Sequence, residues 1–194
     1  MSADPRVAEV LAFWFGEPAE RALGRPHDAW FRKDDAFDAS IRARFGALLD
    51  EARAGGLAGW EADEDGALAL LVVCDQFPRN LFRGDARAFA LDARALALAK
   101  CVVTEGRDAR LRPVERAFVY LPFEHSESLA DQREAVRLFG TLRNDPHAGG
   151  YLEWAVRHLE VIDRFGRFPH RNDALGRAST AQELAFLSQP GSRF

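Results

Sequence analysis

The chain has 194 residues, 47% of them apolar, which is enough to bury one sizeable core but too few for two full domains. We therefore expect a single domain over residues 1–194. The formal net charge of -4 argues against a nucleic-acid-binding protein, because contacts to phosphates require a basic face.

The sequence also predicts a cytoplasmic protein that does not bind membranes. Residues 67–74 form the longest apolar run, which is far shorter than the roughly 20 residues needed to cross a bilayer. The N-terminus lacks the basic segment and the apolar stretch of a secretion signal. Cys74 and Cys101 do not form a disulfide framework, so both are expected to be reduced.

Two amphipathic helices are predicted in the first third of the chain. Asp4 followed by Pro5 is a typical helix start, and the apolar residues that follow recur at helical spacing until Gly16. Residues 16–27 are rich in glycine, proline and charge, which indicates a loop. A second apolar stripe begins at Phe37, and its helix should end at the next glycine pair.

The middle of the chain predicts three more helices. Residues 67–74 contain no polar position, so periodicity cannot separate a strand from a helix, but their alanines and leucines favour a helix. Asp85 is expected to cap a central helix over residues 86–103. Pro113, at a first-turn position, predicts a short helix that ends near Tyr120.

Two helix starts in the last third have the spacing of a capping box, in which a hydroxyl residue is followed three positions later by an acidic one. Ser128 with Asp131 marks the first, and Thr180 with Glu183 marks the second. An apolar stripe over residues 152–162 predicts a further amphipathic helix between them.

These patterns together predict an all-α fold of about eight helices, without an alternating strand pattern. Short connections between helices favour antiparallel helix hairpins, as in bundles and α-solenoids. Residues 88–99 alternate small and large side chains, as does the second helix of a tetratricopeptide (TPR) hairpin. The fold is therefore expected to be TPR-like, although the regular TPR repeat period is absent.

Three segments gather polar residues around a proline, and we name them the first (75–83), second (121–132) and third (164–172) proline segments. Proline removes an amide donor and clashes with the preceding turn, so each segment should break a helix and free carbonyls that need partners. Their candidate binding residues are Asp75, Arg79, Asn80, Arg83, Glu124, His125, Glu127, Gln132, Arg164, Arg167, His170, Arg171 and Asn172.

Two interpretations of these segments stay open. The second segment is acidic and the third is rich in arginine, so the residues could form a structural network in which arginines bind carboxylates and free carbonyls. The alternative is a pocket in which Arg79, Arg167 and Arg171 bind an anionic ligand. In that pocket His125 would move a proton together with a neighbouring glutamate.

The sequence does not support a metal site or a cofactor. The histidines and carboxylates of the second and third segments, with His158, do not fall into the close spacing that zinc or iron sites use. Ser126 lies beside His125 but lacks the Gly-x-Ser-x-Gly turn of a serine nucleophile. We therefore expect no metal and no cofactor.

Several motifs are distributed along the chain, at residues 14–16, 75–80, 82–84, 122–127, 158, 164–172 and 190–192. Together they resemble the domain-of-unknown-function family nine-two-four, and the likeness extends from about Val7 to the C-terminus. Membership implies a helical fold similar to TPR proteins and no established activity, so no catalytic residue is carried over.

The leading functional hypothesis is a TPR-like binding module that holds a small anionic molecule or an acidic peptide. A cofactor-free hydrolase or transferase with His125 as general base is the first alternative. A protein-interaction scaffold is the second. The sequence leaves open whether the protein is an enzyme, and it does not predict an oligomeric state.

Overall fold

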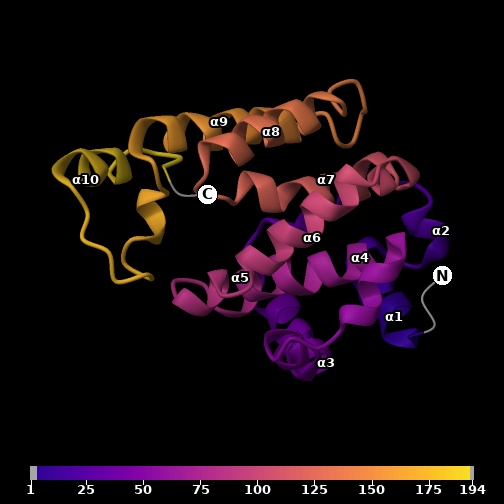
Figure 1. Ribbon diagram of the computed structural model, residues 1–194. Helices are drawn as coiled ribbons and strands as arrows, with labels where there is room; N and C mark the ends of the chain where they lie inside the picture. Colours follow the sequence, from indigo (N-terminus) through magenta and orange to yellow (C-terminus); the bar gives the residue numbers. More distant parts are fainter. Residues whose placement is uncertain (1–3, 193–194) are drawn as a thin grey trace.

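The computed structural model describes residues 4–192, and within that range it contains helices and turns but no strand (Figure 1). The all-α prediction is therefore confirmed. The α-helices are α1 (Pro5–Phe15), α2 (Pro18–Arg21), α3 (Asp35–Arg53), α4 (Glu64–Leu71), α5 (Phe77–Leu81), α6 (Asp92–Thr104), α7 (Pro113–Glu124), α8 (Leu129–Gly140), α9 (Tyr151–Phe165) and α10 (Ala181–Leu187). Shorter helical turns are η1 (Asp28–Trp30), η2 (Ala58–Ala62), η3 (Val72–Gln76), η4 (Ala86–Phe89), η5 (Arg107–Arg110) and η6 (Pro169–Arg171).

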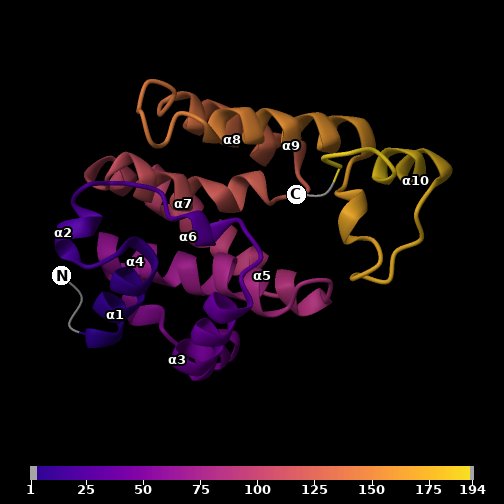
Figure 2. The ribbon, with the colours of Figure 1, turned by 180° about the vertical axis from the view of Figure 1, so that it is seen from behind.

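Helices α6 to α9 pack in sequence as antiparallel neighbours, in layers (Figures 1 and 2). Helices α8 and α9 lie side by side over α7, and α7 in turn lies over α4 and α6. Helix α10 lies beyond one end of the outer layer. Within residues 4–192, no helix has both the length and the apolar character that a membrane crossing requires.

Helix α1 begins and ends as its sequence predicts. The Asp4 carboxylate accepts a hydrogen bond from the Arg6 amide at 3.0 Å, and Pro5 occupies the first turn. Gly16 ends the helix with φ of 88°, a backbone conformation that favours glycine. Helix α10 also begins as predicted, because Thr180 and Glu183 form a capping box in both directions.

The apolar run 67–74 is helical, as predicted, but the expected break at Pro78 is wrong. Helices α4 and α5 form one continuous helical run through η3, a π-helical turn in which the Phe77 amide donates to the Val72 carbonyl. This wider turn accommodates the proline without ending the helix. The Asp75 carbonyl accepts a hydrogen bond from a side chain of the same helical run, that of Arg79, whose Nη1 lies 2.7 Å away.

Helix α7 also continues past a proline, for two residues beyond Pro122. Its end is closed by Gln132 of α8, whose Nε2 donates to the carbonyls of Glu124 at 2.5 Å and Ser126 at 2.6 Å. The third proline segment does interrupt the helical path: α9 ends at Phe165 and η6 begins at Pro169.

Two further helix starts differ from the prediction. Asp85 caps the short turn η4, and the long helix α6 begins only at Asp92. The Ser128 side chain makes no capping bond, because Asp131 accepts from the Ser126 hydroxyl at 2.8 Å instead. The predicted capping box at Ser128 is therefore wrong.

The apolar interior consists of one large cluster and one small one. The large cluster surrounds α4 and contains a set of aromatic contacts, among them Trp14 stacked on Trp30 at 6.0 Å between ring centroids. The small cluster, with Val161, Ile162 and Phe168 at its centre, joins α9 to the chain that follows. The third proline segment thus lies where the second cluster meets the main body.

Candidate functional site

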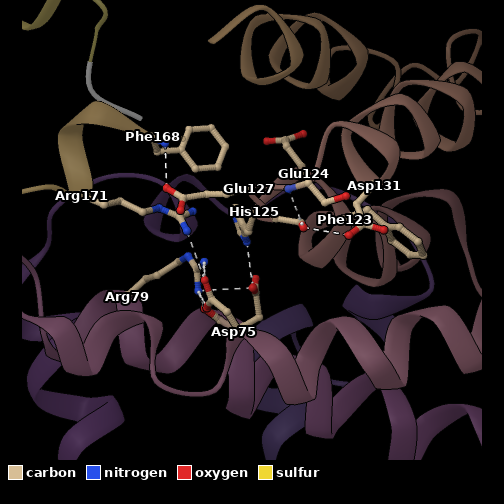
Figure 3. A network of polar contacts seen from close by, with 12 residues as sticks. Asp75, Arg79, Phe123, Glu124, His125, Glu127, Asp131, Phe168 and Arg171 are labelled. Atoms are coloured by element: carbon tan, nitrogen blue, oxygen red, sulfur yellow. Dashed lines mark hydrogen bonds and ion pairs between the residues drawn. The ribbon is translucent and has the colours of Figure 1, made fainter. Parts of the chain in front are cut away.

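Residues of all three proline segments meet in one polar cluster (Figure 3). In this view the side chains from η3 and α5 lie below, those from the end of α7 lie on one side, and that from η6 lies on the other. We define this polar cluster as Asp75, Arg79, Asp92, Glu124, His125, His158, His170 and Arg171.

Asp75 lies at the centre of the polar cluster and is 1% exposed. Its Oδ1 lies 2.8 Å from His125 Nδ1, and its Oδ2 accepts from Gln76 Nε2 at 2.6 Å. Burial alone would raise the pKa of Asp75, but Arg79 and His125 outweigh burial and hold this pKa below its usual range. The carboxylate is therefore ionised, and each of its two oxygens has a hydrogen-bond partner.

Two arginines share one carboxylate in the polar cluster. Arg79 makes a two-pronged contact with Asp92 at 2.9 and 3.0 Å. Arg171 reaches the same carboxylate only at 3.4 Å, through Nη1. Burial and the nearby Arg79 lower the pKa of Arg171 to about 10, so the folded protein disfavours this second positive charge.

Glu124 is a buried carboxyl group with an incomplete hydrogen-bond set. It is 3% exposed, its Oε1 lies 3.3 Å from His158 Nδ1, and its Oε2 is buried and has no hydrogen-bond partner in the part of the chain that the structure describes. Burial, together with the negative charge of Asp75, raises the pKa of Glu124 to about 8. Glu124 is therefore largely protonated at neutral pH.

The three histidines of the polar cluster are neutral. Burial lowers the pKa of His158 to about 3 and that of His170 to about 3, with nearby arginines and other histidines adding to the effect. The pKa of His125 is also lowered, by burial and by Arg79 against the pull of Asp75.

Glu127 closes one edge of the polar cluster. Its carboxylate accepts from Arg177 Nη1 at 2.7 Å, from Arg177 Nη2 at 2.9 Å, and from the Phe168 amide at 2.7 Å. These contacts lower the pKa of Glu127 in spite of its partial burial. Asn172 supports the same edge, because it donates to Ser179 and accepts from Arg177. Both residues fix the chain that carries Arg171.

Besides Glu127 and Asn172, which border the polar cluster, five predicted site residues lie outside it. Asn80 and Arg83 both contact Asp38 of α3, on another face. Arg167 pairs with Glu183 of α10 at 2.6 Å, and Arg164 lies exposed over the Phe165 ring. Gln132 closes the end of α7, as described above, so its role is structural.

Asn80 and Arg83 border a separate hollow of about 330 Å³ between α3 and α5. Arg83 pairs there with Asp38 at 3.2 Å, and Arg42 donates to the Leu81 carbonyl at 3.1 Å. Because these arginines already have acceptors, this hollow is a weaker candidate for an anion site than the polar cluster.

Sequence reasoning missed Asp92, His158 and Arg177. Asp92 reads as an ordinary first-turn acid of α6, and nothing in its neighbourhood signals a contact with Arg171. His158 lies within an amphipathic stripe and belongs to a family motif, which was the one available signal. Among residues 4–192, no three histidine, cysteine or acidic side chains are grouped as metal ligands would be.

The chain belongs to the family described as "Bacterial protein of unknown function (DUF924)", whose model matches residues 10–191. It is also similar to a solved structure, that of the protein of unknown function ATU0120 from Agrobacterium tumefaciens. The two chains are 38% identical with a TM-score of 0.82, over 95% of this chain and 97% of that one. No curated protein matches this chain.

Proposed function

We propose that the polar cluster binds a small molecule carrying a carboxylate or phosphate group. The observation that carries this proposal is the state of Arg171. Its side chain is 8% exposed and makes a single hydrogen bond to residues 4–192, at 3.4 Å, although a guanidinium has five N–H donors. Leaving buried donors without acceptors is costly, so an acceptor from outside the chain is expected.

The free edge of Arg171 suits an oxyanion. Nη1 points to Asp92, whereas Nε is buried without a partner and Nη2 contacts no acceptor among the described residues. The Nε–Nη2 edge binds a carboxylate or phosphate through two parallel hydrogen bonds. Phe168 and Phe89 hold the guanidinium plane, with ring centroids 4.4 and 4.7 Å from its carbon.

The small exposure of the polar cluster favours a small molecule over an acidic peptide. His125 is 13% exposed and Asp92 is 22% exposed, so solvent reaches the cluster through a limited opening. A purely structural network is disfavoured by the unpartnered Glu124 Oε2 and Arg171 Nε, because such networks stabilise a fold only when their members are satisfied.

We further propose a TPR-like arrangement of the hairpins and a cytoplasmic location. The layered antiparallel helices support the first proposal. The unpaired thiols of Cys74 and Cys101 support the second.

A thermal-shift titration tests anion binding. We expect inorganic phosphate, acetate or succinate to raise the Tm of the wild type relative to chloride at equal ionic strength. A ligand at about 100 times its Kd stabilises by roughly 2.7 kcal/mol. Arg171→Gln should abolish the shift, whereas Arg164→Gln, the matched change at an exposed position on α9, should retain it.

Arg171→Gln also distinguishes a ligand-binding role of Arg171 from a structural one, in an experiment that uses no ligand. Because the fold disfavours the charge on Arg171, Arg171→Gln should change the free energy of unfolding by no more than about 1 kcal/mol in chemical denaturation. Losing a partner of a buried structural ion pair would instead cost about 3–5 kcal/mol. That larger loss, or an anion shift unchanged in Arg171→Gln, contradicts the proposed function.

A further inference from the structure

The polar cluster contains a histidine–aspartate pair that anion binding does not require. His125 Nδ1 and Asp75 Oδ1 are 2.8 Å apart, and the Asp75 carboxylate is ionised. An ionised carboxylate only accepts hydrogen bonds, so Nδ1 carries the hydrogen and donates it. The lone pair of the neutral imidazole is then on Nε2, the form that accepts a proton from another molecule.

The π-turn η3 fixes this pair in place. Asp75 lies in that turn, where Gln76 holds one carboxylate oxygen and Arg79 holds the main-chain carbonyl. The carboxylate therefore cannot rotate away from His125 without losing a second buried hydrogen bond. Single π-turns within α-helices occur frequently at functional sites.

His125 Nε2 is open to an incoming molecule. No described residue forms a hydrogen bond with Nε2, and Nε2 is not one of the buried polar atoms that lack a partner, so this nitrogen is exposed to solvent. The hydroxyl of the adjacent residue, Ser126, donates to Asp131 and does not occupy this nitrogen. A water molecule can therefore approach Nε2 from the solvent side.

We propose that the protein hydrolyses carboxylic esters that bear an anionic group, with His125 as the general base and Asp75 as its positioning residue. This inference rests on the proposed function, because Arg171 holds the anionic group of the substrate. The positive charge of Arg79, which acts on His125, also favours the negative charge that develops on the ester carbonyl oxygen.

The reaction needs no reagent other than water. His125 Nε2 removes a proton from water as the water oxygen forms a bond to the carbonyl carbon, which gives a tetrahedral intermediate. The bond from this carbon to the alcohol oxygen then breaks, and the alcohol oxygen takes the proton from His125. The products are a carboxylic acid and an alcohol, and the imidazole returns to its starting form.

Neighbouring side chains do not offer a better nucleophile than water. The Ser126 hydroxyl donates to Asp131 at 2.8 Å rather than to His125. Cys74 is 1% exposed, and burial raises the pKa of its thiol to about 12, so it is not a thiolate at neutral pH. Direct attack by activated water is therefore the route that these residues support.

The test uses two chromogenic esters, the para-nitrophenyl monoester of succinic acid and the para-nitrophenyl ester of butyric acid. We expect turnover of the succinate ester, with kcat/KM about 10²–10⁴-fold lower in His125→Ala or His125→Gln. Asp75→Asn should lower it as well. Arg171→Gln should raise KM for the succinate ester and not for the neutral butyrate ester. His147→Ala, at an exposed loop position, should leave the rate unchanged.

The pH profile separates a general base from a structural residue. In the wild type, kcat/KM should rise with pH as one group loses a proton, and this limb should disappear in folded His125→Ala or His125→Gln. The inference is overturned if this limb persists in both variants, or if both variants hydrolyse the ester as fast as the wild type does. If succinate raises the Tm but its ester is not hydrolysed, esterase activity is refuted while anion binding stands. If succinate has no effect on the Tm, the proposed function itself fails.

Discussion

At the scale of single residues, the polar cluster contains groups whose ionisation opposes one another. Glu124 has a pKa raised to about 8 by burial and by Asp75, so the folded protein keeps its proton above the range of an ordinary carboxyl group. His158 and His170 have pKa values lowered to about 3, mainly by burial, so the folded protein keeps them neutral. These shifts make the free energy of unfolding depend on pH in two opposite directions.

The sign follows from proton uptake in the two states. Between the ordinary pKa of Glu124 and about 8, the folded state binds one more proton than the unfolded state, so stability falls as pH rises through that range. Below the ordinary histidine pKa of 6.5, the unfolded state takes up protons that His158 and His170 refuse, so stability falls as pH decreases. The two histidines outweigh the single glutamate, which predicts maximum stability near pH 6.5.

Glu124→Gln should remove the alkaline side of this profile. The wild type should lose up to about 1.4 kcal/mol per pH unit between pH 6.5 and 8, and the variant should lose much less over the same interval. Urea denaturation at a series of pH values measures both slopes. Glu160→Gln, an exposed change on α9, serves as the control and should keep the wild-type slope. Equal slopes in Glu124→Gln and the wild type would refute this account.

Individual residues also show how far sequence reasoning reaches. The prolines and the clustered charges pointed to Asp75, Arg79, His125 and Arg171, because unusual polar residues near helix ends need partners. Asp92 gave no such signal, since an acid in the first turn of a helix is ordinary. Its contact with Arg171 joins positions 79 residues apart, and only the packing of η6 on α6 brings them together.

At the scale of secondary-structure elements, the local sequence correctly predicted that the elements are helices and where helices with standard caps begin. It did not predict how the helices continue past their prolines. The rule that proline ends a helix failed at Pro78 and Pro122, since a π-turn and a neighbouring helix satisfied the carbonyls. The π-turn is a change of helix type next to the proline, and Gln132 lies eight residues after Glu124, so a rule that considers the proline alone cannot include them. The misplaced capping box at Ser128 has the same origin, because Ser126 competes for Asp131.

Gln132→Leu tests how the end of α7 is held. Gln132 is 0% exposed, and its amide group donates to two carbonyls beyond Pro122, those of Glu124 and Ser126. Leucine keeps much of the volume but removes both donors, so the free energy of unfolding should fall by about 1–3 kcal/mol. Urea denaturation followed by circular dichroism measures the loss. Gln182→Leu, the matched change at an exposed position of α10, should alter stability by less than about 0.5 kcal/mol. A loss no larger than that of the control would show that Gln132 does not hold the helix end.

At the scale of the whole molecule, the buried apolar residues are distributed unevenly along the chain. The large cluster joins α1 to α9, whereas residues 166–192, which we call the C-terminal segment, are held mainly by the small cluster and by ion pairs (Figure 2). The ion pairs that join the segment to the rest of the chain are those of Arg177 with Glu127 and of Arg171 with Asp92, whereas the pair of Arg167 with Glu183 lies within the segment. Arg171 lies in this segment, so the anion site depends on how firmly the segment is attached.

The C-terminal segment should therefore open at a lower free energy than the rest of the chain. Few buried apolar contacts hold it, and opening free energies follow the local contacts that are lost. Native-state hydrogen exchange should show less protection for α10 than for α4 and α7, at the same pH and temperature. Equal protection across these helices would show that the segment unfolds only with the whole molecule.

Glu127→Gln then isolates the ion pair that attaches the segment. The variant keeps an oxygen for the Phe168 amide and removes only the negative charge that faces Arg177. Because both side chains are about a quarter exposed, solvent screens the pair and its loss should lower the opening free energy by about 1 kcal/mol. Exchange should accelerate in the C-terminal segment and stay unchanged in α4, whereas Glu160→Gln on the outer face of α9 should change neither.

Phosphate or succinate bound at Arg171 should slow exchange in the same segment, since a ligand that needs the closed form raises the free energy of opening. If exchange accelerates equally in α4 and α10, Glu127 stabilises the whole fold and does not specifically attach the C-terminal segment.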